Sequence, residues 1–130
     1  SQPLALIEKR FFQLRGGAYF ISQQLPGVTL DEYLVTCHQQ GIDIQPIADQ
    51  LVILFKKLFA EKISHGDFKA TNFIVYQDKV YLIDLDAMRQ HRFKFNFKRR
   101  FAKDLKRFMR NWQNDQKIAQ VFNQKLREFV

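Results

Sequence analysis

The sequence is poor in cysteine and histidine, the residues that most often build disulfides and transition-metal sites. Cys37 is the single cysteine among 130 residues, so the chain cannot form an internal disulfide or a cysteine metal site, and a reducing compartment is expected. The three histidines, His38, His65 and His91, are too scattered to indicate zinc by their spacing. No apolar run reaches the roughly 18 residues that would span a bilayer. The first residues show no signal-peptide pattern, and a start at Ser1 suggests that the native chain begins upstream.

Acidic residues are also few, with 13 Asp and Glu against 21 Lys and Arg, which gives a formal net charge of +8. A chain of this charge is expected to meet an acidic partner, such as nucleic acid, anionic lipid or a phosphorylated substrate. One block, which contains a single acid, Asp104, is a candidate contact face. Its basic residues are Arg89, Arg92, Lys94, Lys98, Arg99, Arg100, Lys103, Lys106, Arg107 and Arg110. No recognised nucleic-acid motif is present, so nucleic acid is not the expected partner.

What the chain does contain is enough apolar material for a real core, with 46% hydrophobic and 15% aromatic residues in one domain or a large piece of one. Two strands, Leu4–Phe12 and Ala18–Gln24, are predicted on either side of the turn Arg15-Gly16-Gly17, because a double glycine marks a hairpin or loop. The sequence Leu25-Pro26-Gly27 then breaks the chain. A strand pair followed by a linker is therefore expected at the start.

Two helices are predicted after this linker. Thr29 and Glu32 have the spacing of a capping box, which predicts a short helix that runs to about Gln39 and is ended by Gly41. The next helix, Pro46–Ile63, is expected to be the most buried element, because its apolar residues recur at spacings of three and four. These residues are Ile47, Leu51, Leu54, Phe55, Leu58 and Phe59.

The remainder is expected to form a short hairpin and two more helices. The hairpin pairs Phe73–Tyr76 with Val80–Ile83 around the turn Gln77-Asp78-Lys79, and the helices span about Lys98–Trp112 and Asp115–Phe129. An alternation of aromatic and polar residues before the first of these helices is expected to be a packed strand or loop. It comprises Phe93, Lys94, Phe95, Asn96 and Phe97. The predicted fold class is α+β.

Four polar residues near the hairpin have the chemistry of phosphoryl transfer. Pairing of the two hairpin strands brings Asn72 and Asp84 to the same end, and an amide oxygen beside a carboxylate suits Mg²⁺, which takes few protein ligands. Asp67 lies close by as an acceptor for a hydroxyl proton. Lys69 supplies a cation for the transferring phosphoryl group. These are the parts that phosphoryl transfer requires.

The same residues resemble the catalytic motifs of the protein-kinase-like fold. Asp67-Phe68-Lys69-Ala70-Thr71-Asn72 looks like the D-x-K-x-x-N catalytic loop, His65-Gly66-Asp67 looks like H-R-D, and Asp84-Leu85-Asp86 occupies the place of D-F-G. The sequence of these motifs is most similar to that of the bacterial lipopolysaccharide core kinases, the Kdo and heptose kinases, which phosphorylate sugars of the lipid A–core region. The likeness runs from about Leu4 to Trp112 and is strongest between His65 and Asp86.

The resemblance implies a role for each matched residue and two parts of the chain. Asp67 resembles the catalytic base and Lys69 the γ-phosphate contact, while Asn72 and Asp84 resemble the Mg²⁺ ligands. Residues 1–27 would be the end of an amino-terminal lobe, and 28–130 the carboxy-terminal lobe. The backbone that meets the adenine of ATP would lie at the hinge, and Asp104 resembles the buried aspartate that braces the catalytic loop. The hinge residues are Gln23, Gln24 and Leu25.

Three departures from the kinase pattern matter. Gly66 replaces the arginine that would receive a phosphorylated activation loop, and Asp86 replaces the motif glycine. The sequence also lacks a glycine-rich loop, a strand lysine for the α- and β-phosphates and a partner glutamate helix, since Lys9 lies too near the hinge. The chain is therefore expected to be an incomplete catalytic domain that is inactive alone, and an exposed strand edge favours its self-association.

Three functions compete at this stage. The first is an ATP-dependent sugar kinase acting on an anionic glycolipid of the lipopolysaccharide core, bound through basic residues to the cytoplasmic face of the inner membrane. The second is a relative of antibiotic and choline kinases, which usually lack a lysine at the position of Lys69. The third is a non-catalytic pseudokinase or basic binding module, against which the intact set of Asp67, Asn72 and Asp84 argues.

Overall fold

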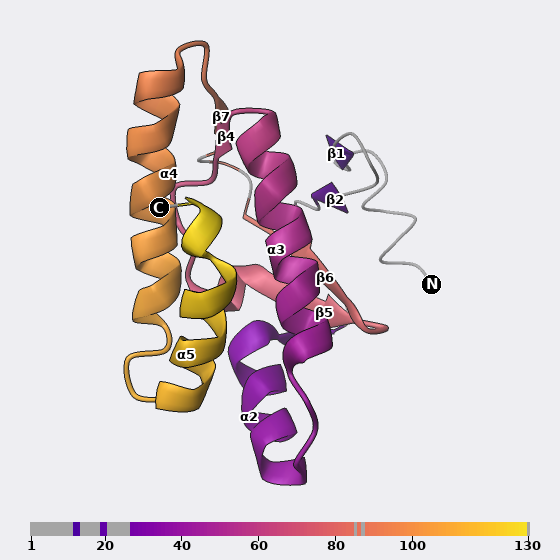
Figure 1. The fold of residues 1–130 in the computed structure, drawn as a ribbon. Helices are drawn as coiled ribbons and strands as arrows, with labels where there is room; N and C mark the ends of the chain where they lie inside the picture. Colours follow the sequence, from indigo (N-terminus) through magenta and orange to yellow (C-terminus); the bar gives the residue numbers. More distant parts are fainter. Residues whose placement is uncertain (1–11, 14–18, 21–26, 85, 87, 130) are drawn as a thin grey trace.

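The computed structural model describes residues 12–13, 19–20, 27–84, 86 and 88–129. These residues form a mixture of helices and small sheets, in which α3 (Gln45–Ala60) packs against α5 (Gln116–Lys125) and against a short β-hairpin of β5 (Phe73–Tyr76) and β6 (Lys79–Leu82) (Figure 1). The α+β class predicted from the sequence is therefore confirmed. Five short strands are hydrogen-bonded in the order β1-β2-β6-β5-β3, and β4 pairs with β7 in a second sheet. None of the described helices is long and apolar enough to cross a membrane.

The first two described strands agree with the predicted strand pair. β1 (Phe12–Gln13) and β2 (Tyr19–Phe20) are antiparallel, with Phe12 opposite Phe20. β2 also pairs in parallel with β6 (Lys79–Leu82). The other residues of the two predicted strands, and the hinge formed by Gln23, Gln24 and Leu25, lie outside the described residues.

The first predicted helix is present, but its capping box does not form. α2 (Leu30–Gln40) has Thr29 at its N-cap position, yet no side chain makes a capping hydrogen bond. Thr29 belongs to β3 (Val28–Thr29), which pairs with β5 (Phe73–Tyr76), and its hydroxyl has no partner among the described residues. The strand, rather than the cap, therefore determines how the chain enters this helix. Gly41 ends α2 with a left-handed φ of 67°, as predicted.

α3 (Gln45–Ala60) is the central helix and has six buried residues, more than any other described helix. It ends three residues before the predicted end at Ile63, because Lys62 has a φ of 55° and turns the chain out of the helix. Ile63 instead begins β4 (Ile63–Ser64), which pairs with β7 (Arg89–Gln90). This turn directs the chain from the core helix into the segment that begins with His65.

The aromatic alternation before the fourth helix is the clearest error of the sequence-based reading. α4 spans Lys94–Arg110, so it begins four residues before the predicted Lys98, and the alternating stretch is neither a strand nor a loop. Phe97 and Phe101, which are four residues apart, are both buried, whereas Phe93 and Phe95 are 63% and 76% exposed. A spacing of four places two side chains on the same helix face, which explains why only Phe97 joins the core.

The end of the chain folds as a shorter helix than predicted. α5 spans Gln116–Lys125, and a 3₁₀ turn follows at Arg127–Phe129. Asp115 caps α5, accepting a hydrogen bond of 3.2 Å from the Ile118 N–H. α5 packs against both α3 and α4, as Figure 1 shows.

Aromatic rings join the helices to the hairpin. Phe55 of α3 stacks on Phe68 with ring centroids 5.1 Å apart and meets Phe108 of α4 edge to face at 5.2 Å. Phe73 of β5 lies 5.4 Å from Phe68. All four side chains are fully buried. Since Phe68 lies between Asp67 and Lys69, this core directly supports the segment that carries the predicted catalytic residues.

Candidate functional site

The candidate site is built on the loop between β4 and β5. The loop ends in a 3₁₀ turn, Ala70–Asn72, that leads directly into β5. Phe68 is buried, but the side chains of Asp67 and Lys69 on either side of it are 36% and 45% exposed. The loop therefore places two charged groups at the surface and anchors the aromatic ring between them in the core.

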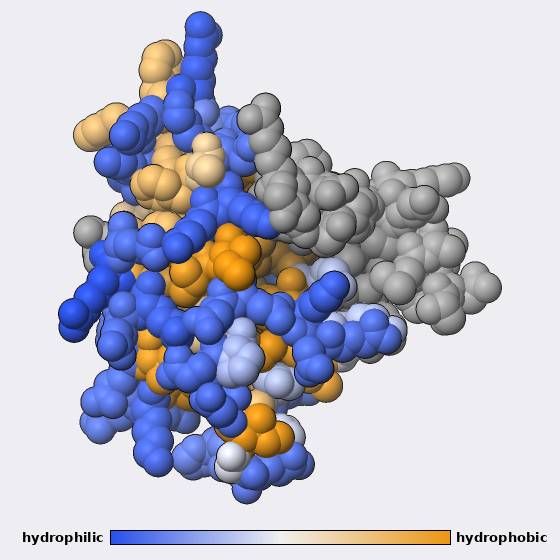
Figure 2. Space-filling model, turned by 45° about the vertical axis from the view of Figure 1, so that its right-hand side comes forward, coloured by the Kyte–Doolittle hydropathy of each residue, from blue (hydrophilic) through white to orange (hydrophobic). Residues whose placement is uncertain are grey.

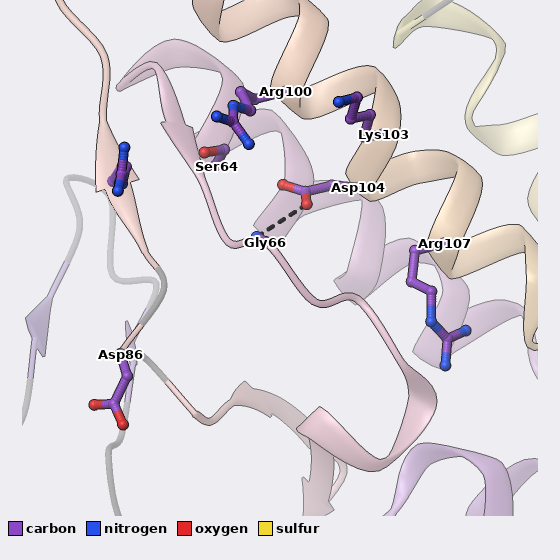
Figure 3. A pocket seen from close by; sticks show the side chains of 8 residues that line it. Ser64, Gly66, Asp86, Arg100, Lys103, Asp104 and Arg107 are labelled. Atoms are coloured by element: carbon purple, nitrogen blue, oxygen red, sulfur yellow. Dashed lines mark hydrogen bonds between the residues drawn. The ribbon is translucent and has the colours of Figure 1, made fainter.

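Asp104 of α4 fixes the start of this loop (Figure 3). Its two carboxylate oxygens accept hydrogen bonds from the backbone N–H groups of His65 and Gly66, at 2.8 and 3.0 Å. Asp104 is only 3% exposed, and burial raises the pKa of its carboxyl, while the two backbone hydrogen bonds act in the opposite direction. The predicted bracing role of Asp104 is therefore confirmed by its contacts.

His65 links this loop to the second strand of the hairpin. The Asp67 N–H donates to His65 Nδ1 at 3.1 Å, so Nε2 carries the ring proton and donates to the Ile83 carbonyl at 2.9 Å. The ring is fully buried. His65 thus sets the spacing between Asp67 and the residue that precedes Asp84, which is a structural role.

Asn72 holds the loop from its other end. Its side-chain Nδ2 donates to the Asp67 carbonyl at 2.9 Å, and its backbone carbonyl accepts from the Ile83 N–H at 2.9 Å. Because the amide nitrogen is used within the protein, Oδ1 is the atom left for a ligand. Asp84 follows Ile83, is exposed and has a left-handed φ of 61°. The backbone thus brings Asn72 and Asp84 to the same end of the hairpin, as the sequence predicted.

The two remaining predicted residues form an open ion pair. Lys69 Nζ lies 3.5 Å from Asp67 Oδ2. An exposed pair of this kind contributes little to stability, because water screens both charges. Both groups are therefore available to a ligand. The predicted adenine-contacting residues, Gln23, Gln24 and Leu25, lie outside the described part of the chain.

The donor atoms at the end of the hairpin fit Mg²⁺ better than a transition metal. Across the described residues there is no group of three or more His, Cys, Asp or Glu side chains that could hold a metal ion. Asn72 and Asp84 offer one amide oxygen and one carboxylate, both hard ligands. Mg²⁺ typically takes one or two protein carboxylates and completes its shell with water and phosphate oxygens. The set is therefore suited to a metal that arrives with a nucleotide.

Asn111 is a site-supporting residue that the sequence reading missed. It follows the last residue of α4, and its Oδ1 accepts from the Ala70 N–H at 3.1 Å while its Nδ2 donates to the Phe68 carbonyl at 3.0 Å. These bonds hold the backbone on both sides of Lys69. They connect residues more than 40 positions apart, so no local spacing could have indicated them.

Comparison with known families agrees with the motifs of this loop. The sequence model of the lipopolysaccharide kinase (Kdo/WaaP) family matches residues 16–128, which include every described residue of the site. A search of curated proteins found no match. The family match covers most of the 130 residues and agrees with the resemblance seen between His65 and Asp86. The chain therefore belongs to the lipopolysaccharide kinase (Kdo/WaaP) family.

Proposed function

We propose that this chain carries the catalytic loop of an ATP- and Mg²⁺-dependent phosphotransferase whose acceptor is a sugar hydroxyl of the lipopolysaccharide core, either Kdo or heptose. The observation that carries the proposal is the set of hydrogen bonds that holds the loop between β4 and β5. Its backbone is held by Asp104, His65, Asn72 and Asn111, while the charged groups of Asp67 and Lys69 remain exposed. A loop whose backbone is held in place while its charged side chains face solvent is the arrangement that orients reactants for transfer.

Each group has one task in the proposed reaction. The Asp67 carboxylate accepts the proton of the sugar hydroxyl while the oxygen of that hydroxyl forms a bond to the γ-phosphorus of ATP. The bond from that phosphorus to the bridging oxygen breaks, and ADP leaves. The Lys69 ammonium lies beside the charge that develops on the transferring group. Asn72 and Asp84 would hold Mg²⁺, which neutralises phosphate charge when it is bound.

The proposed domain arrangement follows the kinase resemblance. Residues 28–130 would form a carboxy-terminal lobe, and residues 1–27 would be the end of an amino-terminal lobe whose hinge, at Gln23, Gln24 and Leu25, meets adenine. The sequence holds no glycine-rich loop and no suitably placed strand lysine. We therefore expect the α- and β-phosphates of ATP to need groups outside these 130 residues.

A membrane-facing end of the molecule fits a glycolipid acceptor. Phe93 and Phe95 are 63% and 76% exposed at the start of α4, within the basic block, and Arg92 lies 5.8 Å from the Phe93 ring centre. At the height where α4 begins, apolar side chains lie between strongly hydrophilic ones (Figure 2). Aromatic side chains with nearby cations favour the surface of an anionic bilayer. This end would meet the cytoplasmic face of the inner membrane.

Phosphoryl transfer by the full-length protein tests the proposal. With γ-labelled ATP, Mg²⁺ and Kdo–lipid A, we expect Asp67→Asn to lower kcat by about 10²–10⁴-fold, because the amide cannot accept the proton. Nucleotide affinity should change little. Asp43→Asn is the matched control, since Asp43 is an exposed carboxylate before α3. A wild-type protein that transfers no label to core glycolipids, or an Asp67→Asn variant with unchanged kcat, would refute the proposal.

A further inference from the structure

A polar pocket lies beside the start of the loop between β4 and β5, with lining residues from α4 and β7. Its volume is about 340 Å³, and Gly66 and Asp104 contribute to its wall. Arg100 and Lys103 project from α4 on one side of Gly66, and Asp86 lies across from the helix (Figure 3). The pocket is therefore next to the candidate site.

Positive charge is concentrated on this pocket by the helix geometry. Arg100, Lys103 and Arg107 are spaced by three and four residues on α4, so they share one face. Arg89 of β7 adds a fourth cation, from the strand that pairs with β4. The four cations outnumber the two carboxylates that line the pocket, Asp86 and Asp104. Part of the basic block is therefore gathered around one pocket.

These cations are not used by ion pairs within the described part of the chain. The ion pairs Lys56–Glu128, Lys69–Asp67 and Lys125–Asp49 do not involve the pocket. Arg107 donates one hydrogen bond, to Asn111 Oδ1 at 3.0 Å. The Asp104 oxygens already accept two backbone N–H groups. Arg89, Arg100 and Lys103 thus keep their charged ends for an anion.

We propose that this pocket binds a phosphate group carried on a sugar, and so holds the phosphorylated part of the acceptor. The inference rests on the proposed function and deepens it. Guanidinium groups match phosphate oxygens in pairs of hydrogen bonds. The volume exceeds what a phosphate ion needs and lies within the usual range of small-molecule sites. Asp86, an exposed carboxylate that repels phosphate, is a good hydrogen-bond acceptor for sugar hydroxyls.

The position of the pocket favours an acceptor over a remote effector. Gly66 lines the pocket and directly precedes Asp67, and consecutive Cα atoms are about 3.8 Å apart. Asp67 does not itself line the pocket, so a sugar unit with its phosphate on α4 would extend past Gly66 to bring a hydroxyl to Asp67. Gly66, whose φ is 94°, contributes backbone and no side chain to this wall.

Direct binding to the full-length protein tests this inference without any turnover. Calorimetry would compare glucose 6-phosphate, glucose, inorganic phosphate, and phosphatidylcholine vesicles with and without phosphatidic acid. We expect glucose 6-phosphate to bind more tightly than inorganic phosphate or glucose. The double variant Arg100→Gln/Lys103→Gln should weaken this binding at least about tenfold. The control Lys98→Gln/Arg99→Gln removes the same charge from α4 outside the pocket and should retain the affinity of the wild type.

Three other outcomes overturn the inference. Equal losses in the two double variants would mean that the general positive field of α4, rather than the pocket, attracts phosphate. If inorganic phosphate binds as tightly as glucose 6-phosphate, the pocket does not recognise the sugar. Binding of phosphatidic acid vesicles without glucose 6-phosphate would identify a lipid headgroup as the ligand instead. If the protein fails to transfer phosphate but binds glucose 6-phosphate in a pocket-dependent way, the proposed function fails and the pocket stands.

Discussion

Removing the Asp104 carboxylate should loosen the loop between β4 and β5 and destabilise the fold by about 2–4 kcal/mol. Asp104→Ala leaves the N–H groups of His65 and Gly66 without their acceptors, and each unsatisfied buried donor costs about 1–3 kcal/mol. His65 is fully buried, whereas Gly66 is exposed, so water can replace the acceptor only at Gly66. Asp104→Asn should cost less, about 1–2 kcal/mol, because its remaining carbonyl oxygen keeps one acceptor.

Urea unfolding followed by circular dichroism gives the free energies, and amide exchange locates the change. In Asp104→Ala the amides of His65 and Gly66 should exchange faster, while those of β5 should follow only the loss of global stability. Asp43→Asn serves again as the control. If Asp104→Ala changes the free energy of unfolding by less than about 0.5 kcal/mol and leaves exchange at His65 unchanged, Asp104 does not brace the loop.

The raised pKa of Asp104 adds a pH dependence with a defined sign. The folded state binds the Asp104 proton more tightly than the unfolded state, for which the ordinary value is 3.8. The stability that this group contributes is therefore fully present below pH 3.8 and is lost as the pH rises through the raised pKa of the folded state. The free energy of unfolding of the wild type, relative to Asp104→Asn, should increase as pH is lowered from 7 toward about 4. A decrease over the same range would contradict the burial argument.

Three further predictions concern the metal, the loop and the membrane. Asp84→Ala should abolish Mg²⁺-dependent nucleotide binding, measured by calorimetry with and without Mg²⁺, and binding unchanged by the substitution would exclude Asp84 as a ligand. Asn111→Ala should lower kcat more than it raises KM for ATP, because the backbone beside Lys69 loses two hydrogen bonds; a change in KM alone would count against this role. Phe93→Ser/Phe95→Ser should weaken sedimentation with vesicles that contain anionic lipid but not solution binding of nucleotide, and equal sedimentation would show that these rings do not touch the bilayer.

The sequence predicted best where neighbouring residues alone decide the structure. The existence of the hairpin, the burial of α3 and the position of Gly41 follow from residue types and spacings within a few positions. The predicted turn was one residue too long, because Lys79 begins β6 and pairs with Tyr76. The candidate site residues could be proposed for the same reason, since Asp67, Lys69 and Asn72 lie within one short motif.

It predicted least where distant segments decide the outcome. The contacts of Asn111 with the loop between β4 and β5 join residues more than 40 positions apart. The cap expected at Thr29 was displaced by strand pairing with Ile74. Alternating phenylalanines indicated a packed strand or loop, but the segment is helical from Lys94 and Phe97 is buried against Phe59 and Phe101. In each case a tertiary contact outweighs a local pattern.

The burial of Phe68 has a consequence for how this protein responds to heat. Many enzymes lose activity before they unfold, since their sites sit on weakly held loops that open first. Here the ring between Asp67 and Lys69 is stacked on Phe55 and touches Phe73 within the core, so the loop cannot leave its place while the core remains intact. Inactivation on heating should therefore coincide with melting of the fold rather than precede it.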